Sequence, residues 1–140
     1  MRVAHFCFFV AIAAALAGMS LGVYMGIAQD FTLAPAHAHA NLLGWVTMAL
    51  YGLYHRSAPR ADTRLAWVQA GRGAAGAAAM SGGLGYYLAT YDEALVGLVI
   101  AGSLFVIAGM LLFLAIVVRD ARQRAQPENS RDSNPSISMA

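Results

Sequence analysis

The chain has 140 residues, of which 59% are hydrophobic and 11% charged, and its mean hydropathy is +0.58. Soluble domains need a polar surface and have roughly a quarter of their residues charged, so this composition excludes a soluble domain and indicates a membrane protein. All nine basic residues are arginine, and a net charge of +2 is too weakly basic to indicate nucleic-acid binding. The single cysteine, Cys7, excludes an intrachain disulfide.

Four apolar stretches are each long enough to cross the roughly 30 Å hydrocarbon layer of a bilayer, which takes about twenty helical residues. We therefore expect an all-α fold, an integral membrane four-helix bundle that occupies residues 1–120. The polar residues 121–140, with proline and serine among them, are expected to form a disordered cytoplasmic tail. The four expected spans are 3–28, 36–55, 65–91 and 94–118.

The arginines predict the orientation of these spans, because cytoplasmic segments carry the excess of basic residues. Arginines precede the first span, lie in the second connection and follow the fourth span. The charged residues of the first and third connections are all acidic. Both termini are therefore expected in the cytoplasm, as in a multi-pass protein of a bacterial inner membrane. The arginines are Arg2, Arg56, Arg60, Arg64, Arg119, Arg122 and Arg124, and the acidic residues are Asp30, Asp92 and Glu93.

The first span has a second interpretation as a secretory signal. Residues 15–17, Ala-Leu-Ala, resemble the small-residue site at which such signals are cleaved. The apolar region of a signal is short, however, and here it continues to Ile27. An uncleaved membrane anchor is therefore the preferred interpretation, and cleavage would leave the other three spans unchanged.

The second span begins with two histidines, His37 and His39, followed by Asn41. Such side chains are costly inside a bilayer unless they bind or pair with something, and a neutral imidazole is a common ligand of transition metals and haem iron. Residues two apart in a regular helix point about 200° away from each other, so the two imidazoles do not bind one ion from regular helix. The sequence leaves open which of the two faces the bundle, because a small error in helix phase reverses the answer.

An irregular start to the second span, after Pro35, would permit a different arrangement. His37 and His39 would then meet a carboxylate at the outer surface as a small metal site, and copper is the metal that we expect there. The expected ligands of this alternative are Asp30, His37 and His39, with Met25 as a further one.

Residues 39–43, His-Ala-Asn-Leu-Leu, together with Trp45, resemble helix II of the catalytic subunit of the haem-copper oxidase superfamily, above all in its nitric oxide reductase branch. The whole chain is also similar to small four-span bacterial proteins described as relatives of oxidase subunit I. The resemblance implies that His39 is an axial ligand of a b-type haem, and that Asn41 packs between helices or supports this ligand. His37 has no counterpart. The matching signatures are Met25-Gly26, residues 30–33 and residues 37–45.

The same resemblance excludes a complete oxidase or reductase. The binuclear centre of that superfamily needs several further histidines, and this chain has none after His55. His5 and His55 are expected at the inner ends of their spans, far in depth from His39. The second axial ligand of a six-coordinate haem would be His39 of another copy in a symmetric dimer, or Met25. A five-coordinate haem that binds nitric oxide or oxygen is the third alternative.

The third span is rich in glycine and alanine, and small residues four apart let another helix approach closely in lipid. This pattern predicts tight packing or a homo-oligomer, or alternatively room for a flat ligand such as a porphyrin. Arg72 lies in the same span, about 12 Å from its inner end at 1.5 Å per residue. It either reaches to the interface or binds an anionic group such as a haem propionate. The small residues at this spacing are Gly71, Ala75, Ala79 and Gly83.

These patterns predict an inner-membrane protein that binds haem b and acts in electron transfer, or as a gas-binding accessory with a partner in the respiratory chain. A copper-binding or copper-handling protein is the first alternative. A cofactor-free structural or assembly protein is the second. An enzyme is not expected, because no nucleophile with its base and no spaced pair of carboxylates is present.

Overall fold

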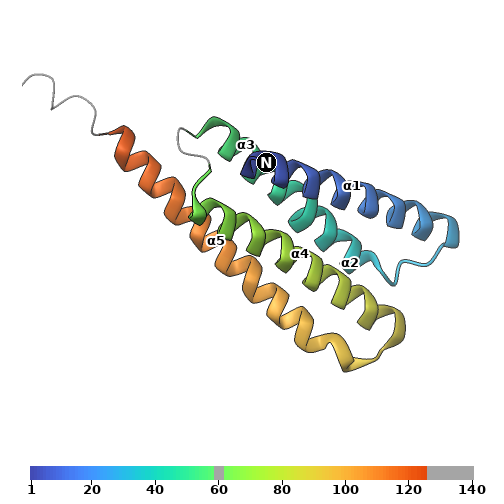
Figure 1. The fold of residues 1–140 in the computed structure, drawn as a ribbon. Coiled ribbons are helices and arrows are strands. Elements are labelled where there is room, and N and C mark those ends of the chain that lie inside the picture. Colours follow the sequence, from blue (N-terminus) through green and yellow to red (C-terminus); the bar gives the residue numbers. More distant parts are fainter. Residues whose placement is uncertain (59–61, 126–140) are drawn as a thin grey trace, which may run out of the picture.

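The computed structural model describes residues 1–58 and 62–125, and this part of the chain is helical and contains no strand. It forms four helical rods that lie side by side (Figure 1). The all-α expectation is confirmed. The rods are α1 (Val3–Ala28); α2 (Ala34–His39), the π-helical segment η1 (Ala40–Thr47) and α3 (Met48–Ser57) in continuous succession; α4 (Arg64–Thr90); and the short 3₁₀ turn η2 (Glu93–Leu95) followed by α5 (Val96–Arg124).

The rods begin and end within a few residues of the expected spans, apart from the last one. α5 runs six residues past the expected end at Val118, to Arg124. The expected tail therefore begins with helix, and its remainder, 126–140, lies outside the described residues.

Local interactions at the helix ends explain where the rods stop and start. Gln29 directly follows α1 and Tyr91 directly follows α4, and both residues adopt the left-handed conformation that commonly terminates helices. Thr63 begins α4, where its hydroxyl oxygen accepts a hydrogen bond from the Ala66 amide at 3.2 Å. Asp92 does the same before η2, with a 2.9 Å bond from the Ala94 amide to its carboxylate.

Two helices are long and apolar enough to cross a membrane: α1, and the helix formed by residues Glu93–Arg124. The α2–η1–α3 rod is divided into shorter elements by its π-helical segment, and glycine and alanine make α4 less apolar than the other two. Composition and length therefore support two membrane-crossing helices, and the arrangement of four spans stays a proposal.

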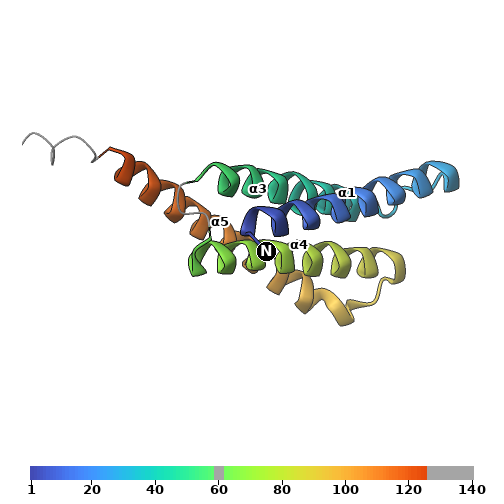
Figure 2. The same cartoon turned by 45° about the horizontal axis from the view of Figure 1, so that its top comes forward.

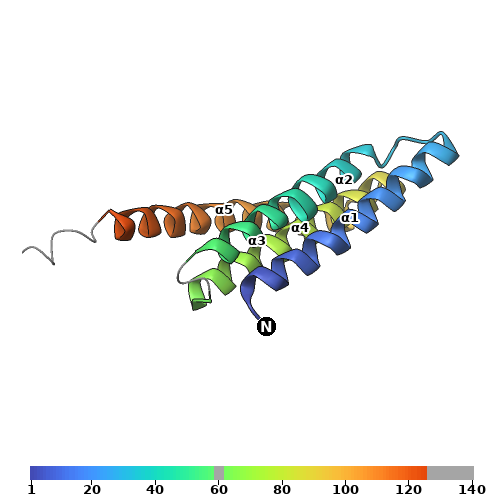
Figure 3. The same cartoon turned by 90° about the horizontal axis from the view of Figure 1, so that it is seen from above.

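The rods associate as two pairs. α1 packs along η1 and α3, whereas α4 makes the most extensive interface of the described structure with α5 (Figure 2). α4 also contacts α2 and η1 and so joins the two pairs. The C-terminal end of α5 extends beyond the other rods (Figure 3). The buried core lies toward the N-terminal end of α1, and consists of Val3, Cys7, Ala11, Met48, Tyr51, Ala66 and Ala70.

Glycines allow α4 and α5 to approach at backbone distance. A methyl group added to Gly76 would lie 2.8 Å from the Gly102 carbonyl oxygen, and one added to Gly102 would lie 2.6 Å from the Met80 amide nitrogen. Gly83 is packed against Val99 in the same way. Part of the glycine-rich third span is therefore used within the chain, whereas Gly82 has open space beside it.

This packing predicts opposite effects for two glycines of α4. We expect Gly76→Ala to lower the free energy of unfolding by about 1 to 3 kcal/mol, because the new methyl overpacks against backbone that cannot move aside. Gly82→Ala is the matched control and should be neutral or slightly stabilising, because alanine favours helix and meets nothing. Unfolding in detergent, followed by circular dichroism, measures both, and equal effects would contradict the α4–α5 interface.

Candidate functional site

The polar residues of the second rod meet α1 at two glycines. A methyl group at Gly18 would lie 2.5 Å from Nδ2 of Asn41, and one at Gly22 would lie 3.0 Å from Cε1 of His37. The two polar side chains therefore occupy the space that glycine leaves on α1. This close approach places a histidine ring directly against a neighbouring helix backbone.

His37 is held against α1 through one ring nitrogen. Its Nδ1 lies 2.9 Å from the Gly18 carbonyl oxygen, and because a carbonyl only accepts, Nδ1 carries the proton and donates. The Asn41 amide donates to the His37 carbonyl oxygen at 2.9 Å, and its nitrogen lies 3.4 Å from both ring nitrogens of His37. His37 thus joins α1 to the second rod, with the Asn41 side chain packed beside its ring.

His39 makes a different contact. Its Nδ1 donates to the Pro35 carbonyl oxygen, one turn earlier in the same helix, at 2.7 Å. Its Nε2 has no partner among the described residues. A ring fixed through Nδ1 with its Nε2 lone pair available has the tautomer and orientation that metal-ligating histidines show. His39 thus keeps an available Nε2, whereas the His37 ring lies against α1.

The two faces of the second rod separate these roles. Residues on the His37 face, including Gly44, Met48 and His55, are buried, whereas the face shared with His39 is exposed. His37 and His39 are both half-buried themselves, but His37 lies on the face that packs against α1 and His39 on the face whose other residues are exposed. The exposed apolar residues of the His39 face are Leu42, Val46, Leu50 and Leu53.

A π-helical segment begins directly after His39. It spans Ala40–Thr47, and the Thr47 hydroxyl donates to the Leu42 carbonyl oxygen, five residues earlier, at 2.8 Å. The wider turn leaves backbone carbonyls without their usual partners, and such segments are frequent at functional sites. The irregularity expected near this position therefore exists, but it follows His39 and leaves the turn that holds both histidines regular.

Asp30 does not join the histidines. Its fully exposed carboxylate accepts from both the amide and the hydroxyl of Thr32, at 2.9 and 2.6 Å. These hydrogen bonds lower the pKa of Asp30, the hydroxyl contributing most. No group of three His, Cys, Asp or Glu side chains in the described ranges is placed to hold a metal ion. The structure does not bring Asp30, His37 and His39 together, because each side chain is bound to a different backbone segment.

Met25 lies at a different depth from His39. Gly22 of α1 lies beside His37 of the second rod, and the two helices run in opposite directions. Met25 lies three residues after Gly22, toward one end of the bundle, and His39 lies two residues after His37, toward the other end. At 1.5 Å per residue the two are separated by about 7 Å along the helix axes. Met25 is also buried, whereas the face of the rod that carries His39 is exposed.

Arg72 lies farther from His39 along the bundle axis than Met25 does, and in the opposite direction. Its neighbour Gly73 packs against the Tyr51 ring, twelve residues beyond His39 on the second rod. The axial separation of Arg72 from His39 is thus about 18 Å. The Arg72 side chain is exposed on α4. The structure brings together His37 and Asn41 from the expected residues, and leaves His39, Met25, Arg72 and Asp30 apart.

Gly18 and Gly22 are site residues that the sequence interpretation missed. They belong to a glycine repeat at spacing four, with Gly26 as its third member. The repeat is the pattern that lets membrane helices approach closely, so it was a usable signal for the partner of His37.

Comparison of this chain with protein-family models, with curated proteins and with solved structures gave no match.

The two histidines are expected to differ in their effect on stability. His37→Ala should lower the free energy of unfolding of the cofactor-free protein by about 1 to 2 kcal/mol, because it breaks a hydrogen bond between helices. His39→Ala should change it by less than about 0.5 kcal/mol, because its ring bonds only within its own helix. Denaturant unfolding in detergent measures both, and a larger loss in His39→Ala would reverse these assignments.

Proposed function

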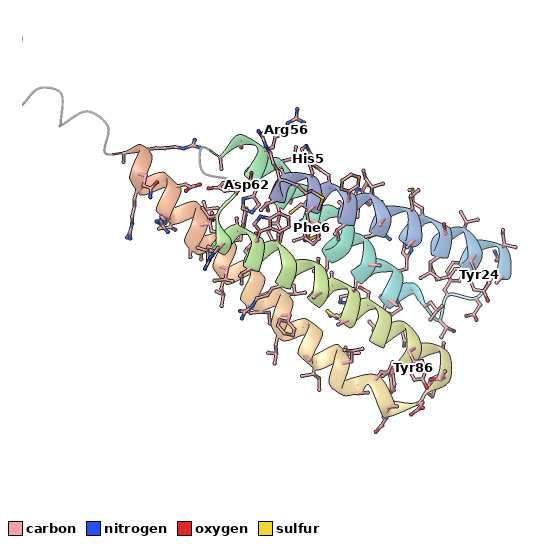
Figure 4. The ribbon with its side chains drawn as sticks, viewed as in Figure 1. His5, Phe6, Tyr24, Arg56, Asp62 and Tyr86 are labelled. Carbon is pink, nitrogen blue, oxygen red and sulfur yellow. The ribbon has the colours of Figure 1, made fainter. Side chains whose placement is uncertain are left out.

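We propose that this chain is a four-span protein of a bacterial inner membrane with both termini in the cytoplasm. The length of the four rods supports this, and so do the different residue types at the two ends of the bundle, with arginine at one end and tyrosine at the other. Arg56 and the N-terminal residues His5 and Phe6 lie at one end, whereas Tyr24 and Tyr86 lie at the other (Figure 4). Arginine at the cytoplasmic side and exposed tyrosine at an interface are typical of membrane proteins.

Reporter fusions test this orientation. A reporter fused after residue 125 is expected to be active only in its cytoplasmic form, and one inserted after Asp30 only in its periplasmic form, because the arginines stay inside. A periplasmic signal from the first fusion would contradict the orientation. Equal signals from both fusions would contradict the four-span arrangement, because three spans separate the two fusion points and an odd number places them on opposite sides of the membrane.

We further propose that the protein binds haem b through His39. The observation that carries this proposal is the His39 ring, which donates from Nδ1 to the Pro35 carbonyl oxygen and keeps Nε2 available. Exposed apolar side chains continue along the same face, among them Leu42, Val46 and the partly exposed Trp45. A donor imidazole beside an apolar surface suits a porphyrin, whose iron would take Nε2 as its axial ligand.

The chain's own residues would set the position of this ligand. The Pro35 carbonyl fixes the ring orientation and raises the basicity of Nε2. The His37–Asn41 pair holds the rod against α1, so the His39 helix has one defined rotation. A haem supplies an iron that accepts an electron reversibly or binds a small gas. We therefore propose electron transfer or gas binding as an accessory to respiration, with a respiratory-chain partner.

No other histidine of the same chain is placed to supply the second axial position: the ring of the nearby His37 packs against α1. His55 lies sixteen residues further along the rod, about 24 Å from His39. We propose that His39 of a second copy, or an exogenous gas, takes this position. A homo-oligomer of this kind would use the exposed His39 face, or the side of α4 at which Gly71 and Gly82 have open space.

The two alternatives receive less support. Copper binding lacks a three-ligand group among residues 1–58 and 62–125. A cofactor-free structural protein would explain His37 and Asn41, which join two helices, but it gives no reason for an outward imidazole with an available Nε2.

Absorption spectra of the protein purified from haem-replete cells test the haem proposal. We expect a Soret band and an α band of b type in the reduced protein, lost in His39→Ala and retained in His5→Ala, which removes an exposed histidine at the opposite end. Added imidazole should restore the spectrum in His39→Gly by filling the vacated position. A spectrum unchanged in His39→Ala would refute His39 as the ligand, and its absence from the wild type would leave the structural alternative.

A further inference from the structure

An open groove lies on the outer surface of α5, near the C-terminal end of this helix and far from His39. Its volume is about 450 Å³. All of its lining residues belong to α5 and all are exposed, so no other described element covers this face. The lining residues of this α5 groove are Leu111, Leu114, Ala115, Val118, Arg119, Arg122 and Gln123.

The α5 groove changes from apolar to basic along the helix axis. From Leu111 to Val118 its lining is apolar, over about 10 Å at 1.5 Å per residue. Arg119 and Arg122 follow, and residues three apart are neighbours on one side of a helix. Ala115 has the smallest side chain of the lining and leaves room between its larger neighbours. This is the order of an acyl chain followed by a charged headgroup.

The two arginines lie where the bundle ends. A methyl group added to Gly109 of α5 would lie 3.3 Å from the Gly73 amide nitrogen of α4, so these residues are level with each other. α4 begins at Arg64, nine residues before Gly73. Arg119 lies ten residues after Gly109, which is the same direction in this antiparallel pair. Arg119 and Arg122 therefore lie on the part of α5 that extends beyond the other rods (Figure 3).

The positive charge of the groove is not balanced within the described residues. Among these, neither Arg119 nor Arg122 forms an ion pair with a carboxylate. Asp120 lies beside Arg119 in the sequence, but its carboxylate accepts from the Tyr54 hydroxyl at 2.9 Å and does not line the groove. The groove thus presents two guanidinium groups to an anionic ligand.

A phospholipid fits both parts of the groove. Guanidinium groups bind phosphate oxygens in a bidentate manner, and anionic lipids attract basic residues at the membrane surface. A zwitterionic lipid balances its phosphate with its own ammonium group, whereas an anionic lipid leaves that charge for the protein. A second copy of the chain in the same orientation would bring its own arginines to this depth, where like charges repel.

We propose that the α5 groove binds an anionic phospholipid of the cytoplasmic leaflet, with an acyl chain along its apolar part and the phosphate between Arg119 and Arg122. The proposal rests on the proposed orientation of the chain in the membrane. It is separate from His39 and does not depend on haem.

Native mass spectrometry of the full chain in detergent micelles tests this site with two lipids of identical acyl chains, phosphatidylglycerol and phosphatidylcholine. One phosphatidylglycerol is expected to bind about tenfold more tightly than phosphatidylcholine. The double variant Arg119→Gln, Arg122→Gln should remove about this tenfold preference. The matched control Arg2→Gln, Arg56→Gln removes the same charge from exposed positions at the same end, outside the groove, and should keep the preference.

Two further measurements separate a lipid from other occupants. Ala115→Trp fills the groove and keeps both arginines, so it should weaken phosphatidylglycerol binding. Inorganic phosphate in excess should not displace the lipid, because it lacks the acyl chain. Circular dichroism checks that each variant is folded, which the exposed positions of these residues favour.

Equal affinity of the wild type for the two lipids would overturn the proposal, and so would equal losses in the two double variants. Displacement by inorganic phosphate would show a site for a free anion instead. A wild-type dimer that is lost in Ala115→Trp would assign this face to a second copy. Binding in micelles requires neither haem nor a defined orientation, so failure of the lipid site is distinct from failure of the reporter fusions or of the haem spectrum.

Discussion

Close approach of helices at glycine is the constraint on which the rest of this structure depends. In the proposed membrane environment there is little hydrophobic drive to bring apolar helices together, so packing and hydrogen bonds between them must do so. Gly18 allows its own carbonyl oxygen to accept from His37, and Gly76 and Gly102 bring α4 to α5 at backbone distance. A side chain at any of these positions would separate the rods, and the polar contacts between them would be lost.

The polar residues then divide into groups with different environments. His37 and Asn41 pack against α1 at Gly18, where His37 donates to the carbonyl oxygen. His39 bonds through Nδ1 within its own helix and keeps Nε2 available. His55 lies at the opposite end, buried with an amide and beside a cavity. Two imidazoles on one rod thus have different environments: His39 is held within its own helix, and His55 is buried against Gln69.

Much of the fold could be predicted, because apolar length and helix-ending residues are local properties. The candidate site could be predicted only in part. The proposal for His39 as a ligand comes from its motif, and the different faces of His37 and His39 follow from helix periodicity. The proposed approach of Asp30 was wrong, because the nearby Thr32 hydroxyl and amide satisfy its carboxylate first. The role of Gly18 was missed, because the importance of a glycine depends on what packs against it.

The sequence by itself determined the all-helical class, the positions of the helices and the arginine-rich end. These follow from hydrophobicity and charge, which are read along the chain. Only the tertiary structure decided that His37 faces α1 and that the pair of His55 and Gln69 is buried. Helix rotation is set by which side chains fit into the space left by a neighbouring helix, and a glycine repeat in one segment indicates close packing without naming the side chain that fills the space.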